Sequence, residues 1–419
     1  MESTEHLFRR EAGRMVSALT RVFGMHNFAL AEDVIQDAFC KALEAWSKSG
    51  IPANPSAWLM ATAKHRALDV LRRERTARKF APELGRLLDS EWTLAPVVEE
   101  MFAPNAIKDD LLRMMFSCCQ PQLSEQAQVA LVLNVLCGFR TSEVASAFVS
   151  SLAATEKRIQ RAKQVLAASK SLFDITVASD FVNRLPAVHR ALYLLFNEGY
   201  HGASAEHAVR ADLCREAMRL SAILLDHPLG ATPTTYALSS LMCLNLARLP
   251  ARLDDAGDLL ALADQDRRLW DPQLIKEGMQ LLDLSASGDY VSEYHVEAAI
   301  AATHASAASA DTTDWQRIVA LYDELIALRP TPIVALNRAI AVAQAEGPER
   351  GLEELQAIGA KERLSDYPFY WAALGELELS CGRSSAAEEH LKAARARARN
   401  PVERRFFAQR LGALHSKAD

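Results

Sequence analysis

The sequence predicts an all-α protein with two small helical domains followed by a C-terminal helical repeat domain. Half of the 419 residues are apolar, and only 7% are aromatic, as in Ala- and Leu-rich helical proteins. Apolar residues recur at helical spacing along most of the chain, and no run alternates as in a half-buried strand. The prolines of the last 250 residues recur at regular intervals, which indicates a repeat.

The net charge of −6 is unevenly distributed along the chain. Residues 1–170 contain 22 Lys and Arg against 19 Asp and Glu, whereas residues 171–419 contain 25 against 34. Within the first part, 1–80 and 127–170 are basic and the segment between them is acidic. This layout predicts a front end that binds a polyanion and a back end with a different role.

Three helices are predicted in residues 1–80, at about 5–23, 31–47 and 55–79. The second has an acidic first turn, Glu32 and Asp33, which favours a helix start there. The third starts with Pro55 and combines an apolar stripe with many basic residues. Such a helix suits a nucleic acid, and Trp58 is expected to pack in the core rather than to stack on bases. Its basic candidates are Lys64, Arg66, Arg72, Arg73, Arg75 and Arg78.

Residues 81–108 are interpreted as an acidic, Pro-containing linker, and 109–170 as a second helical unit. Within that unit, a short helix from Thr141 to Phe148, a tight turn and a helix to about Ala168 have helix–turn–helix spacing. In such a motif the start of the second helix faces the bases, which here means Ser151, Ala153, Ala154, Thr155 and Arg158. Lys157, Arg161 and Lys163 are placed to contact phosphates.

Residues 171–419 contain a weak repeat of about 34 residues, the tetratricopeptide period. Pro233, Pro332, Pro368 and Pro401 are each expected to begin a helix. A small residue follows each proline by seven positions and would let paired helices approach closely: Ser240, Ala339, Gly375 and Ala408.

Several classes of protein are disfavoured by the sequence. The N-terminus lacks the layout of a signal peptide and no apolar run is long enough for a bilayer, so the chain is expected to be cytoplasmic and away from membranes. The seven cysteines show no CxxC spacing and are expected to be buried thiols. No nucleotide-binding or hydrolase motif is present, so neither an enzyme nor a cofactor is expected. Glu198, His201, Glu206 and His207 cluster in sequence, but a metal site is not expected there.

The ordered set of motifs resembles the extracytoplasmic-function (ECF) sigma factors of bacterial RNA polymerase. AEDVIQDAFCKALEAW and PSAWLMATAKHRALDVLRRER are similar to region 2, and RTSEVASAFVSSLAATEKRIQRAKQVL is similar to region 4. Residues 171–419, with FNEGY, LCREAMRL and LNRAIAV, resemble the tetratricopeptide-like extension of one subgroup.

The resemblance implies a role for each part of the chain. Region 2 would bind the β′ clamp of core polymerase through Asp33, Gln36, Asp37 and Phe39. It would hold the opened minus-ten strand on the basic helix, where the candidate DNA-binding residues are Asn54, Trp58, Lys64, Arg66 and the cluster from Arg72 to Lys79. Region 4 would contact the β flap and read the minus-thirty-five element of promoter DNA. The extension would regulate the factor, either by holding it inactive or by receiving a signalling protein.

Two other functions remain open at this stage. One is a stand-alone helix–turn–helix regulator with a repeat sensor domain, which would bind duplex DNA without polymerase. The other is a helical-repeat enzyme that uses carboxylates in a groove. Promoter opening together with core polymerase distinguishes both from a sigma factor.

Overall fold

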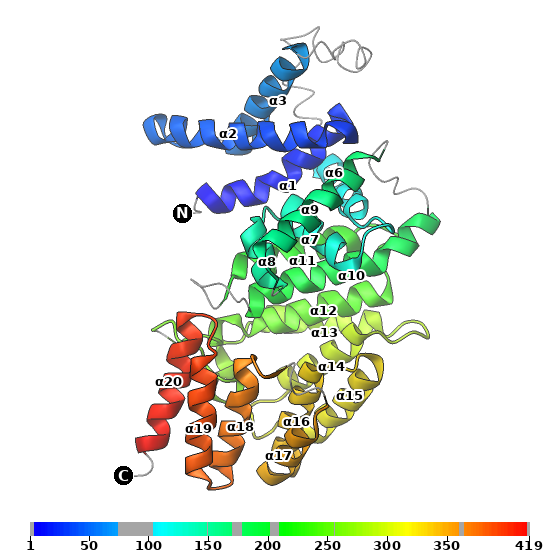
Figure 1. The fold of residues 1–419 in the computed structure, drawn as a ribbon. Helices are drawn as coiled ribbons and strands as arrows, with labels where there is room; N and C mark the ends of the chain where they lie inside the picture. The colour runs from blue at the N-terminus through cyan, green and yellow to red at the C-terminus, as the bar shows by residue number, and fades with distance from the viewer. Residues whose placement is uncertain are drawn as a thin grey trace. The chain divides into compact units, whose positions relative to one another are not determined.

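The computed structural model describes residues 4–73, 104–148, 150–169, 178–201, 209–254, 256–359 and 364–416. Within these ranges the regular elements are helices, with one isolated bridge between Leu253 and Leu259, so the predicted all-α class is confirmed (Figure 1). No helix in the described ranges is long and apolar enough to cross a bilayer. The α-helices are α1 (Thr4–Phe23), α2 (Phe28–Ser49), α3 (Pro55–Arg73), α6 (Pro104–Cys118), α7 (Glu125–Val135), α8 (Thr141–Ala147), α9 (Leu152–Ala167), α10 (Ala178–His201), α11 (Ala211–Leu225), α12 (Pro233–Ala247), α13 (Pro272–Ser285), α14 (Glu293–Ser306), α15 (Trp315–Leu328), α16 (Pro332–Glu346), α17 (Pro348–Ala357), α18 (Pro368–Ser380), α19 (Ser384–Ala396) and α20 (Pro401–Ser416).

The chain forms two compact units, Met1–Leu195 and Phe196–Asp419. The division falls inside α10, whereas the sequence places a domain boundary between residues 170 and 171. The predicted domains 1–80, 109–170 and 171–419 were defined by function, and a division into compact units does not test them. They therefore remain predictions.

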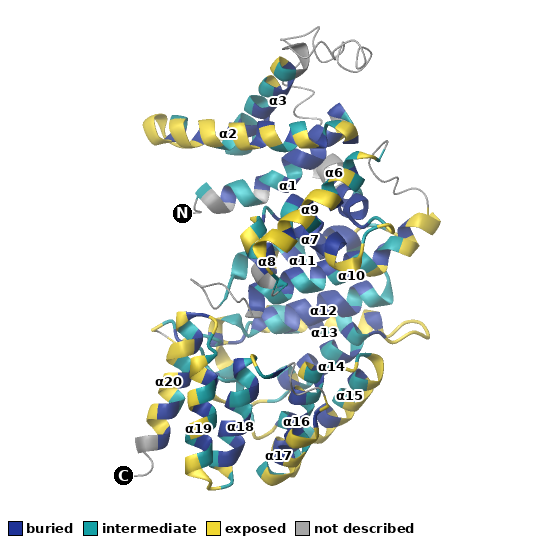
Figure 2. Ribbon diagram, in the orientation of Figure 1, coloured by how far each residue is buried: buried dark blue, intermediate teal, exposed yellow. Residues whose placement is uncertain are grey.

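The first unit packs α1, α2 and α3 together and adds α6 to α9 beside them. Figure 2 shows α2 with both buried and exposed positions along its length. Its buried stripe includes Val34, Ile35, Ala38 and Trp46, as the sequence predicts for a helix with one packed face. Burying this stripe against α1 and α3 leaves the polar face of α2 uncovered by those two helices.

The boundaries of three predicted segments differ in the structure. The helix α2 begins at Phe28, so Glu32 and Asp33 lie in its second turn rather than its first. Pro104, predicted within the linker, begins α6, as proline at a first helical turn can. The rest of the predicted linker, 81–103, and the end of the basic helix, 74–79, lie outside the described residues.

The second unit is a series of helices in which successive helices pack against one another. Pro233, Pro332, Pro368 and Pro401 each begin a helix, which confirms that prediction. The assignment to tetratricopeptide repeats remains a prediction.

Three of the four small residues lie at helix contacts. Ser240 is buried and donates a hydrogen bond to the Gly278 carbonyl, 2.7 Å away. A Cβ at Gly375 would lie 2.8 Å from Leu391, so α18 and α19 pack too closely for a side chain there. Ala339 is 1% exposed, as expected for a residue at a helix contact. Ala408 is exposed, so the prediction that the small residue lies at a helix contact was wrong for the helix that begins at Pro401.

The cysteines are unbonded thiols, and Cys40 is exposed on α2, contrary to the expectation that all are buried.

Candidate functional site

The first turn of α3 is held by Asn54, whose side chain caps the helix. Its Oδ1 accepts a hydrogen bond from the Ala57 amide at 3.1 Å. Trp58 is half-buried and meets Trp46 edge-on, with ring centroids 5.6 Å apart. The indole thus serves the packing of α2 on α3, as expected from its place on the apolar stripe.

Lys64 lies on the buried side of α3 rather than on the nucleic-acid face predicted for it. Lys64 is 3% exposed, and its Nζ has no hydrogen-bond partner among the described residues. Burial also lowers the pKa of this amine, because the charged form loses its hydration. The helical period places Lys64 on the packed face of α3, so the prediction that it contacts DNA was wrong.

Arg66 and Asp37 are paired with each other, although the sequence assigns them to different partners. Arg66 Nε donates to Asp37 Oδ2 at 2.9 Å, and both side chains are well exposed, at 36% and 50%. They line one groove together with Asp33 and Gln36, with a volume of about 570 Å³. This groove places the acidic face of α2 directly beside the basic face of α3.

The remaining basic candidates of α3 are only partly described. Arg72 and Arg73 belong to the last turn of the helix. Arg75 and Arg78 lie outside the described residues.

The predicted docking residues of α2 are largely exposed. Asp33, Gln36 and Asp37 lie on its open side. Phe39 is half-buried instead and stacks on Phe8 of α1, with ring centroids 4.4 Å apart and planes 11° apart. This stacking fixes the Phe39 ring next to the exposed polar residues of α2.

The helices α8 and α9 are joined by a tight turn that Thr155 stabilises from within. Thr155 is fully buried, its hydroxyl lies 2.6 Å from that of Ser150, and it donates to the Ser151 carbonyl at 3.1 Å. Ser151 caps α9 by accepting from the Ala154 amide. The predicted base contact of Thr155 is therefore corrected, because its polar atom is occupied in the turn.

The outward side of α9 carries most of its other candidates. Ser151, Ala153, Lys157 and Arg161 are exposed. Arg158 is half-buried, and its guanidinium lies 6.0 Å from the centroid of the Phe148 ring. The first three turns of α9 thus present small and basic residues to the surroundings, as a phosphate-binding helix would.

Lys163 does not join that exposed row, because it points toward α2. Its Nζ donates to Glu32 Oε1 at 2.6 Å, and the two side chains are 28% and 23% exposed. Burial raises the pKa of Glu32 above its usual value, although Lys163 and its hydrogen bond oppose that change. Lys163 therefore links the two basic modules instead of standing free for a phosphate.

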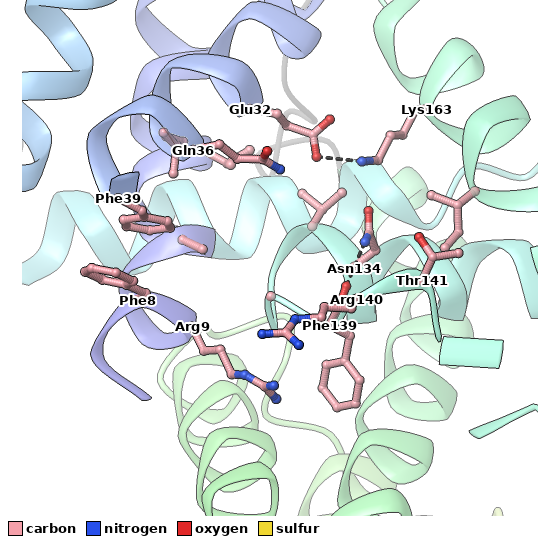
Figure 3. Close-up of a pocket in the computed structure, with 16 residues that line it drawn as sticks. Phe8, Arg9, Glu32, Gln36, Phe39, Asn134, Phe139, Arg140, Thr141 and Lys163 are labelled. Atoms are coloured by element: carbon pink, nitrogen blue, oxygen red, sulfur yellow. Dashed lines mark hydrogen bonds and ion pairs between the residues drawn. The ribbon is translucent and has the colours of Figure 1, made fainter. Parts of the chain in front are cut away.

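A cavity of about 480 Å³ separates α1 and α2 from α7, α8 and α9 around this ion pair (Figure 3). Gln36 and Phe39 line it from α2, and Arg140 and Thr141 line it from the other side. Arg9 also lines the cavity, and its Nη2 lies 2.9 Å from Glu143 Oε1. Gln36 and Phe39 belong to the candidate docking face of α2, and they therefore face α8 and α9 across this cavity.

Sequence reasoning missed Glu32, Arg9 and Glu143 as residues that join the two modules. Each looks like an ordinary charged position within its own helix, and the partners are more than 130 positions apart. No local pattern in the sequence signals such a pairing.

No group of His, Cys, Asp and Glu in the described residues has the arrangement of a metal site. Glu206 and His207, of the cluster weighed in the sequence, lie outside the described part of the chain.

Comparison with known proteins matches two parts of the chain to family models. Residues 7–77 match sigma-70 region 2, and residues 184–286 match a family of unknown function (DUF6596). The uncharacterized protein R00370 of Rhizobium meliloti (strain 1021) is 38% identical over 401 residues, which cover 95% of this chain and 93% of that protein. No solved structure matches the chain significantly.

Proposed function

The chain belongs to the same family as R00370 of Rhizobium meliloti and carries a sigma-70 region 2 domain, and we propose that it is a promoter-specificity subunit of bacterial RNA polymerase. The observation that carries this proposal is the region 2 match, which spans α1, α2 and α3. We assign the chain, more narrowly, to the ECF factors with a tetratricopeptide-like extension.

Binding of core polymerase is proposed for the exposed face of α2. Asp33, Gln36 and Asp37 offer carboxylates and an amide there, and Phe39 adds a ring held by Phe8. A polar face with an aromatic at its edge suits a partner helix pair such as the β′ clamp helices.

Contact with opened minus-ten DNA is proposed for α3. Asn54 and Arg66 are exposed or half-exposed at its surface, and the run from Arg72 to Arg78 adds positive charge at its end. Phosphates of a single strand require such a basic track. Lys64 is left out of this assignment because it is buried.

Recognition of the minus-thirty-five element is proposed for α8 and α9, with α9 in the major groove. Ser151, Ala153 and Arg158 would face the bases, and Lys157 and Arg161 the phosphates. The same unit would contact the β flap. The proposal needs no cofactor and no covalent chemistry.

Regulation is proposed to act on the contact between α2 and α9. The Lys163–Glu32 pair holds α9 beside the proposed polymerase-binding face of α2. Polymerase can reach all of that face only after α9 has moved away, so the arrangement is proposed to be the inactive one. The C-terminal unit, residues 196–419, would bias it in response to a signalling protein.

The decisive experiment measures binding of the full chain to purified core polymerase, followed by run-off transcription over a promoter library. Reversal of two exposed charges, Asp33→Lys with Asp37→Lys, is expected to weaken core binding at least tenfold. Asp289→Lys, an exposed reversal before α14, is the control and should bind normally.

Two outcomes would overturn the proposal. One is a chain that neither binds core polymerase nor directs initiation at any promoter, both as the wild type and as Lys163→Glu, which breaks the contact between α2 and α9. The other is sequence-specific binding of duplex DNA by the chain alone without any effect of polymerase, which would favour the stand-alone regulator.

A further inference from the structure

Three arginines of the second unit lie close together without a carboxylate partner. Arg248 is the C-cap residue of α12, Arg252 follows four residues later, and Arg267 begins a short 3-10 helix, Arg267–Leu269. None of the three forms an ion pair with a described residue, whereas other half-buried arginines of this unit, such as Arg338 and Arg410, do. All three residues are half-buried, and a cation that has lost part of its hydration normally has a counter-charge, so this cluster requires an explanation.

Arg267 is anchored by neutral oxygens alone. Its Nη1 donates to the carbonyls of His304 and Ala307, at 2.6 and 2.7 Å, and its Nη2 donates to the Thr313 hydroxyl at 2.9 Å. Its guanidinium also lies 5.0 Å from the centroid of the Trp270 ring. These contacts fix its position but leave its charge uncompensated.

Arg252 is fixed in a similar way. Its Nη1 donates to the Tyr200 carbonyl at 2.6 Å, and its guanidinium lies 4.0 Å from the centroid of the Tyr200 ring. Here too an aromatic face and a carbonyl take the place of a carboxylate.

Arg248 is less satisfied than either neighbour. Its guanidinium forms no hydrogen bond with any described residue and lies 5.3 Å from the Trp270 centroid; its Nε is buried. Burial lowers its pKa, and the positive charge of Arg252 acts in the same direction. The carbonyl end of α12 contributes about half a negative charge beside it, which leaves most of the positive charge unopposed.

Two further buried polar atoms in the cluster lack partners. They are Trp270 Nε1 and His304 Nδ1, on side chains that are 4% and 8% exposed. Burial and then the positive charges of Arg248 and Arg267 lower the pKa of His304 to about 4, so its ring is neutral at pH 7. The indole can act only as a donor, and a neutral imidazole can donate from Nδ1.

We propose that Arg248, Arg267, Trp270 and His304 form a binding site for a small oxyanion, a phosphate or a carboxylate group. Such a group supplies the missing negative charge and accepts hydrogen bonds from the Arg248 guanidinium and from the unsatisfied ring nitrogens. Trp270 and His304 are almost completely buried, so we expect only a small group to reach their ring nitrogens. The residues of this site belong to the second unit, whereas those assigned to polymerase and DNA belong to the first.

The test uses the full chain and inorganic phosphate, with chloride added to hold ionic strength constant. Calorimetry and Trp fluorescence are expected to show saturable binding, and the melting temperature is expected to rise with phosphate through mass action. Acetate in a parallel titration distinguishes a carboxylate site from a phosphate site. If neither anion binds more strongly than chloride, the proposal is wrong, whatever the variants do.

Arg248→Gln removes the least satisfied guanidinium and is expected to weaken anion binding at least tenfold. Arg248→Lys keeps the charge but not the planar fork, and a several-fold loss is expected. Arg268→Gln is the matched control, because Arg268 is 90% exposed and pairs with Asp266. Wild-type anion affinity in both Arg248 variants, or an equal loss in Arg268→Gln, would overturn the assignment.

Discussion

Reversing the charge of Lys163 is expected to separate α9 from α2 and so to strengthen binding of core polymerase. Lys163 Nζ lies 2.6 Å from Glu32 Oε1. At an effective dielectric constant of about 20, the attraction at that distance is about 6 kcal/mol. Burial of Glu32 opposes it, since the pKa of that carboxyl is raised and not lowered, so the pair itself stabilises the contact only slightly.

The substitution Lys163→Glu does more than remove this small stabilisation. It places two carboxylates face to face at a position where both side chains are mostly buried. We take about 2 kcal/mol for the resulting shift toward the separated arrangement, which corresponds to about 30-fold in population. If the separated arrangement is the one that binds, the apparent Kd falls by up to the same factor.

The assay is fluorescence anisotropy of the labelled chain with core polymerase, without DNA, because Lys163 was also a candidate phosphate contact. Lys157→Glu makes the same charge change on the exposed side of α9 and should leave the Kd unchanged. The double exchange Glu32→Lys with Lys163→Glu should restore the wild-type Kd. An unchanged Kd for Lys163→Glu, or a double exchange that behaves as the single variant, would refute the reasoning.

Further predictions concern stability. Lys64→Met should raise the unfolding free energy by about 1–2 kcal/mol, because it removes a buried amine without a described partner. The pKa of Lys64 is lowered in the folded chain, so the wild type gains stability as pH rises toward 10.5. Denaturant unfolding at several pH values should show that the variant lacks this gain. Burial lowers the pKa of His189 to about 3, so the unfolded chain binds this proton first and stability is lost as pH falls from about 6.5 toward 3; His189→Leu should flatten that slope by up to about 1.4 kcal/mol per pH unit, and an unchanged slope would contradict the assignment. Gly375→Ala should cost about 1–3 kcal/mol because its Cβ would meet Leu391 at 2.8 Å, whereas Gly412→Ala, with nothing within 4 Å, should gain up to about 1 kcal/mol; equal melting temperatures would show that the close approach is absent.

Within α3 the sequence predicts the packed stripe and the start at Pro55, but it misjudges Lys64. The apolar period identifies Leu59, Ala63 and Ala67 as core, and all three are buried. Lys64 adjoins that stripe, and its long side chain suggests a surface position. Which side of the stripe is covered depends on the angle at which α2 crosses α3, and no local pattern encodes that angle.

In the turn before α9, too, the sequence predicts the helices but not which side chains are free to bind. Helix–turn–helix spacing is readable from Thr141 to Ala168, and the helices occur there. Thr155 occupies a position that faces the bases in such a motif, yet its hydroxyl is used inside the turn. Short polar side chains satisfy nearby backbone groups when they are buried, so their availability cannot be judged from position alone.

The sequence by itself determined the helical class, the proline-started helices of the second unit and the charge contrast between the two parts of the chain. These follow from local periodicity and composition, which act within a few residues. Only the tertiary structure decided that Glu32 meets Lys163, that Arg66 meets Asp37, and that Arg248 and Arg267 share Trp270. Such pairs form because packing brings together residues that are separated in the chain. Where packing also removes water, an ion pair becomes stronger and a charge without a partner becomes more costly.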